Sequence, residues 1–167
     1  MLNTHQRIGS ISNAHVGAEF ERVAAAYFLA AGIDVSPNYR VPVGLAIKKD
    51  HSFDLGSGSP KILIECKSHR WTAGDKVPSA KMTTWNEAMY YFHVAPPGYR
   101  KIFFVLHHKR NGSGESLVSY YRRIYAHLIP EDVEFIEWDE ESNAIIPDQN
   151  KKKPNKSEQA TPRKPSD

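Results

Sequence analysis

The chain of 167 residues contains a single cysteine, Cys66. One thiol cannot form an intrachain disulfide, and it cannot build a four-cysteine zinc site. We therefore expect a reducing, cytoplasmic setting. Long apolar runs are also missing, since no stretch approaches the roughly 18 residues that a membrane-spanning helix needs. Residues 1–13 lack the basic and then apolar pattern of a signal peptide, so we expect neither a membrane association nor secretion.

Two further absences narrow the class of protein. The phosphate-binding pattern G-x-x-x-x-G-K-[S/T] does not occur, so we expect no nucleotide cofactor. Residues 148–167 hold no aromatic residue and only one apolar side chain, an alanine, which is too little to offset the entropy of ordering them. The sequence therefore predicts one domain over residues 1–147 and a disordered basic tail over residues 148–167.

The charges are divided unevenly along a chain whose net charge is only +3. Residues 1–130 hold sixteen basic and nine acidic residues, whereas residues 131–141 hold seven acidic residues and no basic one. The tail is basic again, with six basic and three acidic residues. A basic body suits a polyanionic partner such as nucleic acid. The alternative is that the charges interleave over a solvated surface.

The apolar pattern predicts a helix over residues 13–31. Asn13 is a suitable N-cap, and Gly32 is a suitable terminator. Apolar side chains recur at spacings of three and four, which makes one stripe at about 100° per residue. The members of this stripe are Val16, Phe20, Val23, Tyr27 and Ala31.

The remaining pattern predicts strands and helices in alternation. Residues 33–47 are β-branched and broken by prolines, which favours an edge strand or a loop. A hairpin follows, in which Phe53 and Leu55 alternate with Asp54, and residues 62–67 alternate beyond the turn GSGSP. We expect a helix over 79–93, a central strand over 101–108, a helix or less favourably a strand over 116–128, and a last strand over 133–138. This order predicts an α/β fold with a mixed sheet.

Asp54, Glu65 and Lys67 carry the chemistry that the sequence indicates. Glu65 and Lys67 share one face of a strand because side chains alternate with period two. A hairpin turn near residues 58–60 brings Asp54 across from Glu65 or beside it, at about 5 Å. Two carboxylates that close repel one another unless a cation lies between them, and Mg²⁺ takes oxygen ligands and keeps several waters. Most such pairs are solvent-facing charges, but Glu65 follows a run that is apolar on both faces, where an unpaired charge is costly.

These residues resemble the motif of the PD-(D/E)xK nuclease superfamily, which includes restriction endonucleases and archaeal Holliday-junction resolvases. The pattern D-x₁₀-E-x-K spans residues 54–67. Residues 17–22 (GAEFER), with Gly32 behind them, are similar to the first helix of resolvase-type and Mrr-type members. The match covers residues 14–70, and beyond it only the order of elements agrees. Phe53 stands where many members have proline, and the residues after Lys67 do not follow the resolvases closely.

The resemblance implies a restriction-endonuclease-like fold with a central mixed β-sheet flanked by helices, and a metal-dependent endonuclease that hydrolyses phosphodiester bonds in DNA. It implies that Glu21, Asp54 and Glu65 bind one or two Mg²⁺, with Mn²⁺ as a substitute, and that Lys67 assists the attacking water. Nucleases of this size often act as homodimers. Two alternatives stay open: an inert DNA-binding module of the same fold, and a protein-interaction domain, which the acidic segment 131–141 favours because it would repel DNA. RNA stays open as a substrate.

Other candidates lie around the hairpin. A basic stretch with one aromatic residue follows it and is expected to grip phosphates and stack on a base; its members are Arg70, Trp71, Lys76 and Lys81. His51 and His69 flank the hairpin and approach the site if it forms as predicted, although loop histidines without a role are commoner. Residues 107–111 (HHKRN) faintly resemble a His/Asn nuclease arrangement, but a further ligand histidine at the right spacing is missing.

Overall fold

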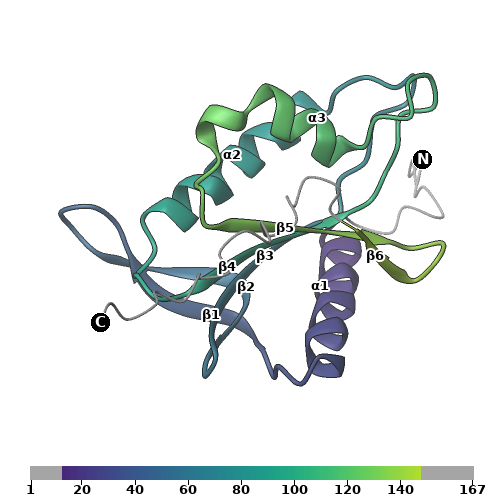
Figure 1. Ribbon diagram of the computed structural model, residues 1–167. Coiled ribbons are helices and arrows are strands. Elements are labelled where there is room, and N and C mark those ends of the chain that lie inside the picture. The colour runs from purple at the N-terminus through teal and green to yellow at the C-terminus, as the bar shows by residue number, and fades with distance from the viewer. Residues whose placement is uncertain (1–12, 148–167) are drawn as a thin grey trace, which may run out of the picture.

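A central six-stranded sheet organises the computed structural model of the chain, which describes residues 13–147 (Figure 1). The predicted basic tail, residues 148–167, lies outside the described residues. The strands are β1 (Ser36–Val43), β2 (Lys49–Gly58), β3 (Lys61–Lys67), β4 (Arg100–Leu106), β5 (Val133–Asp139) and β6 (Ala144–Ile146). They lie in the order β1-β2-β3-β4-β5-β6, so sequence neighbours are also spatial neighbours.

The sheet is mixed, as the sequence predicted. β1, β2 and β3 form an antiparallel meander, β3, β4 and β5 run parallel, and β6 returns antiparallel to β5. Each parallel connection needs a crossover, and helices provide both of them. The central strand β4 is buried along six of its seven residues, which explains why residues 102–106 are apolar without alternation.

Three α-helices cover the two faces of the sheet (Figure 1). They are α1 (Asn13–Ala30), α2 (Ser79–His93) and α3 (Leu117–Ile124), and a 3₁₀ turn, Ala126–Leu128, follows α3. α1 packs on one face through a core that includes Phe20, Phe28 and Phe104. α2 and α3 pack on the other face around Trp85 and Tyr121. Within residues 13–147, no helix is long and apolar enough to cross a membrane.

The first helix begins and ends close to the predicted residues. Gly32 follows it with φ of +77°, a conformation that suits glycine, and the N–H of Ile33 closes the last turn on the carbonyl of Phe28. The predicted apolar stripe was partly wrong. Its buried centre is Phe20, Ala24 and Phe28, because the helix turns its phenylalanines toward Phe104, and Val16 is left 43% exposed.

The second helix has the predicted bounds, and residues 117–124 are helical, as favoured. The strand at 133–139 is not the last one, however, because β6 follows it. β6 has only three residues, none of them fully buried, so its apolar pattern is too short to predict a strand.

Candidate active site

Asp54 lies where β2 separates from β3. The two strands pair from Gly58 and Lys61 up to Leu55 and Ile64, and continuing this register places Asp54 across from Glu65, as predicted. At this point the ladder stops, and the main-chain N–H of Cys66 donates instead to the Asp54 carboxylate at 2.7 Å. The side chain of Asp54 is therefore held at the point of separation by the backbone of β3.

The side-chain alternation of β2 breaks at the same residue. Phe53 packs in the core beneath α2 and α3, whereas Leu55 packs in the core beneath α1. The prediction that both point to one face was wrong, because residues two apart share a face only in a regular strand. Asp54 is half-buried at this break and belongs to neither core.

The structure brings Glu65 and Lys67 together with Asp54. The Nζ atom of Lys67 lies 2.8 Å from Oε2 of Glu65 and 3.8 Å from Oδ2 of Asp54. All three side chains are largely withdrawn from water: the exposed fraction is 7% for Glu65, 16% for Lys67 and 27% for Asp54. One ammonium group therefore lies against two carboxylates at the end of a buried strand.

His51, on β2, completes the surroundings of Glu65. Its Nε2 lies 3.6 Å from Oε1 of Glu65, and its ring stacks on Tyr91 of α2 at 3.6 Å between centroids. The stacked ring fixes the imidazole beside the carboxylate. The sequence placed His51 near the hairpin but gave no reason to prefer it over an idle loop histidine, because its contact with α2 is long-range.

The surroundings shift the pKa values of Asp54 and Glu65 in opposite directions. Burial, helped by the charge of Glu65, raises the pKa of Asp54 to about 6. Burial also acts on Glu65, but the neighbouring His51 and Lys67 outweigh it and hold the pKa of Glu65 below its ordinary value. The two carboxylates raise the pKa of Lys67, although its own burial opposes them. Lys67 is therefore an ammonium ion at neutral pH.

Glu21 approaches the same cluster from α1. It lines a cavity of about 460 Å³ that is open to solvent. The cavity is lined by Val16, Gly17, Glu21, Asp54, Cys66, Lys67, Ser68, His69, Lys81 and Thr84. Partial burial is the main cause of a raised pKa of Glu21, with the charge of Glu65 adding to it. Three carboxylates thus share this region with Lys67, whose charge lowers the pKa of each of them.

The oxygen donors of the cluster fit a hard divalent cation, although they do not form a complete set of ligands. Within residues 13–147, no three acidic, histidine or cysteine side chains converge into a complete metal centre. Mg²⁺ does not require one, because it keeps several waters and binds through one or two carboxylates and the phosphates of a substrate. Asp54 and Glu65 supply oxygen donors of this kind, and burial together with the charge of Glu65 raises the pKa of Asp54. Glu21 lines the same cavity from α1, and its carboxylate is the third acidic group there.

The four residues that were predicted to contact nucleic acid lie in different environments. Lys81 lines the cavity, and Lys76 is exposed. Arg70 is paired with Glu140. The prediction that Trp71 stacks on a base was wrong, because its side chain is 5% exposed and Arg110 covers its ring at 3.9 Å. Its indole N–H donates to the carbonyl of Glu115, so Trp71 anchors a loop instead.

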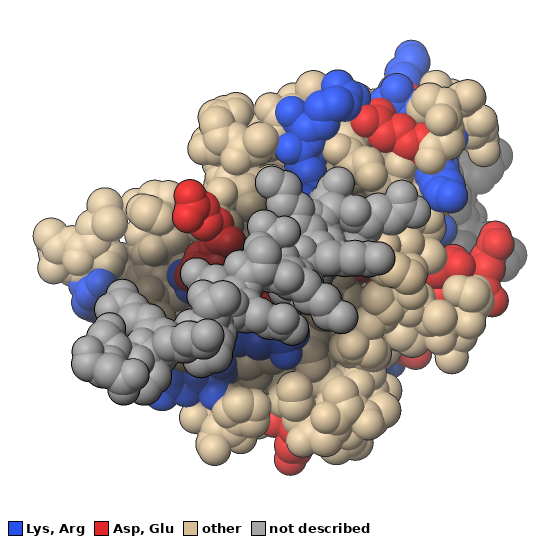
Figure 2. Space-filling model, in the orientation of Figure 1, with Lys and Arg blue, Asp and Glu red and all other residues tan. Residues whose placement is uncertain are grey.

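Three of the seven acidic side chains in segment 131–141 are paired with lysine or arginine. Ion pairs join Lys101 to Asp132, Arg100 to Glu134 and Arg70 to Glu140, and His107 is hydrogen-bonded to Glu137. On the face in Figure 2, acidic and basic side chains are interspersed, as the interleaved alternative expected. The segment is therefore partly balanced by basic side chains of the same domain.

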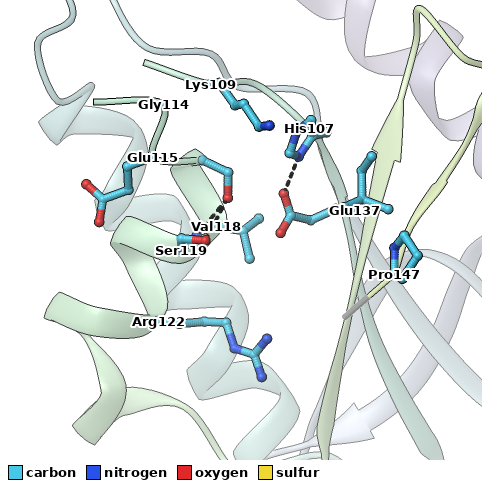
Figure 3. Close-up of a pocket in the computed structure, with 11 residues that line it drawn as sticks. His107, Lys109, Gly114, Glu115, Val118, Ser119, Arg122, Glu137 and Pro147 are labelled. Atoms are coloured by element: carbon cyan, nitrogen blue, oxygen red, sulfur yellow. Dashed lines mark hydrogen bonds and ion pairs between the residues drawn. The ribbon is translucent and has the colours of Figure 1, made fainter. Parts of the chain in front are cut away.

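A second cavity, of about 400 Å³, lies between α3 and β5. Figure 3 shows His107 and Glu137 facing one another there, joined at 2.6 Å, with Lys109 and Arg122 on either side. Residues 107–111 do not form a nuclease motif: His107 is held by Glu137, the Nδ1 of His108 accepts from the main chain of Trp71, and Asn111 donates to Asp75. Each of the three side chains bonds a different partner.

No known protein family, curated protein or solved structure matches the chain. The geometry around Asp54, Glu65 and Lys67 is therefore the main guide to function.

Proposed function

We propose that this protein is a metal-dependent endonuclease that hydrolyses phosphodiester bonds in DNA and has a restriction-endonuclease-like fold. One observation carries the proposal: Asp54, Glu65 and Lys67 meet where two strands separate, beside an open cavity, with more negative charge than Lys67 can balance. A structural ion pair does not need a second carboxylate whose pKa is raised by burial and by the charge of its neighbour. Perturbed groups of this kind beside a cavity are typical of functional sites.

Asp54 and Glu65 are the residues that would hold Mg²⁺ or Mn²⁺, with Glu21 in contact through water. The ion would lower the pKa of a bound water and offset charge on the phosphate. Glu65 is kept ionised and oriented by Lys67 and His51. Asp54 is oriented by the N–H of Cys66. Both carboxylates are thus fixed before a cation or a substrate arrives.

Lys67 acts as a fixed positive charge. Its raised pKa keeps the proton on Nζ, so it does not serve as a base that activates water. The ammonium instead stabilises negative charge that develops on the phosphate in the transition state. It also keeps the two carboxylates close together while no metal ion is bound.

The cavity is open, as a polymeric substrate requires, and the two lysines that line it, Lys67 and Lys81, suit a polyanion. DNA is the substrate that the sequence resemblance favours. One site cuts one strand, so we expect a homodimer if both strands of a duplex are cut. The single cysteine makes the cytoplasm the expected location.

The experiment is cleavage of plasmid and branched DNA by the full chain with Mg²⁺, Mn²⁺ or EDTA. Lys67→Met is compared with Lys61→Met, which removes an exposed lysine from the other end of β3. We expect metal-dependent nicking by the wild-type protein and by Lys61→Met, and a loss of about 10²–10³-fold in Lys67→Met. Circular dichroism confirms that the variants are folded.

The other outcomes distinguish the alternatives. DNA binding without cleavage under any metal condition would favour the inert binding module. Absence of both binding and cleavage would overturn the nucleic-acid function and leave the protein-interaction domain. A parallel assay with single-stranded RNA decides between the two nucleic acids.

A further inference from the structure

His69 lines the active-site cavity. Lys81 and Thr84, both on α2, line the cavity as well. His69 follows β3 by two residues and is half-buried. Its Nδ1 lies 2.8 Å from Nε1 of Trp85, an indole that is fully buried. The ring is thereby anchored on its inner side, and its outer side borders the cavity.

The contact with Trp85 fixes the tautomer of His69. An indole N–H is a donor only, so Nδ1 of His69 must be the acceptor and cannot carry a proton. A neutral imidazole protonates one nitrogen, and here that nitrogen is Nε2. Burial and the nearby charges of Lys81 and Lys67 lower the pKa of His69 to about 4, which agrees with a neutral ring. Within residues 13–147, no acceptor for Nε2 is found.

We propose that the His69 Nε2–H, with the ammonium group of Lys81, forms a phosphate-recognition wall that holds a DNA phosphate oxygen beside the carboxylates. This inference rests on the proposed function, because it assigns a phosphodiester to the cavity. A neutral donor suits this position: it bonds an anionic oxygen without adding a charge that pH can remove. Lys81 supplies the long-range attraction, and the anchored imidazole supplies the direction.

His69 is a positioning residue for the substrate in this arrangement. The charged groups around it are Lys67, Lys81, Asp54 and Glu21. The first two attract a phosphate, and the last two repel one until a cation balances them. The wall would therefore hold the phosphate beside His69 and Lys81 and leave Asp54 free to contact a cation.

Two matched variants test the donor. His69→Asn keeps an oxygen that can accept from Trp85 but is too short to reach the cavity. His69→Gln extends an amide N–H to about the position of Nε2. Affinity for a short fluorescein-labelled DNA duplex is measured by anisotropy, with Ca²⁺ replacing Mg²⁺. We expect His69→Asn to bind about tenfold more weakly, the effect of losing one hydrogen bond to a charged group, and His69→Gln to stay close to wild type.

A second measurement shows which nitrogen of the His69 imidazole carries the proton. Long-range ¹H–¹⁵N spectra of the imidazole at neutral pH distinguish the Nε2-protonated from the Nδ1-protonated ring, and titration with inorganic phosphate shows whether an anion shifts the His69 signals. An Nε2-protonated ring whose signals move with phosphate supports the inference. An Nδ1-protonated or cationic ring overturns it.

The outcomes separate the inference from the proposed function. If the wild type binds DNA and His69→Asn binds equally well, the phosphate-recognition wall is wrong and the nuclease proposal stands. If the wild type binds no DNA but phosphate shifts the His69 signals, the donor is right and the nuclease proposal fails. If neither ligand has an effect, both are overturned.

Discussion

Asp54 is expected to destabilise the metal-free fold at neutral pH. Its pKa is raised from 3.8 to about 6, mainly by burial. A difference of about two pH units corresponds to about 3 kcal/mol, and partial exposure of the side chain reduces this to about 2–3 kcal/mol. Asp54→Asn removes the titration and keeps an oxygen for the N–H of Cys66. We therefore predict that Asp54→Asn unfolds with a larger free energy than the wild type at about pH 7.5.

The sign of the pH dependence follows from proton linkage. Between about pH 4 and pH 6, the folded chain keeps a proton on Asp54 that the unfolded chain has lost. The folded state then binds more protons, so its stability falls as pH rises through this window. The advantage of Asp54→Asn should be fully present above about pH 6 and absent below about pH 4.

The assay is urea unfolding in EDTA across this pH range, followed by circular dichroism. Thermal scans should show an increase of about 5–10 °C in the Tm of Asp54→Asn near neutral pH. Asp50→Asn, an exposed site on the same strand, is the control and should change stability by less than about 0.5 kcal/mol. A stabilisation of Asp54→Asn that does not vary with pH would refute the reasoning, as would no stabilisation at pH 7.5.

Three further predictions concern the cluster and the core. Saturating Mg²⁺ at about one hundred times its Kd should stabilise the wild type by about 3 kcal/mol and Asp54→Asn much less; calorimetric scans with and without EDTA test this, and equal stabilisation would place the metal elsewhere. Glu21→Gln should lower metal affinity or cleavage by about 10–100-fold, whereas Glu19→Gln on the exposed side of α1 should not; equal effects of the two would remove Glu21 from the site. Phe104→Ala should reduce the free energy of unfolding by about 3–5 kcal/mol, because Phe104 is fully buried among Phe20, Phe28 and Trp138; a loss below about 1 kcal/mol by urea titration would contradict this packing.

Periodicity in the sequence was enough to predict most of the elements. α2 has the predicted bounds because Pro78 precedes it and prolines follow it, and β4 is central because its apolar run leaves no polar face. β6 was missed because three residues are too few to establish a period. The orientation of α1 was also missed, since the exposure of Val16 depends on how the helix packs against β4.

The candidate site was only partly predictable for a similar reason. Asp54, Glu65 and Lys67 come from one hairpin, so local register was sufficient to bring them together. His51 and His69 owe their positions to Tyr91 and Trp85, both on α2, and no short-range pattern links them. Trp71 looked like a stacking residue because an aromatic among basic residues is typical of nucleic-acid contacts, but the loop that carries it folds inward.

The measurement closest to the central claim is nicking of supercoiled plasmid in Mg²⁺ by the wild type, Glu65→Gln and Glu87→Gln. Glu65 is buried against Lys67, whereas Glu87 is an exposed glutamate on α2. We predict relaxed circles with the wild type and Glu87→Gln, and none with Glu65→Gln. Equal nicking by a folded Glu65→Gln would show that the cleavage does not arise at this site.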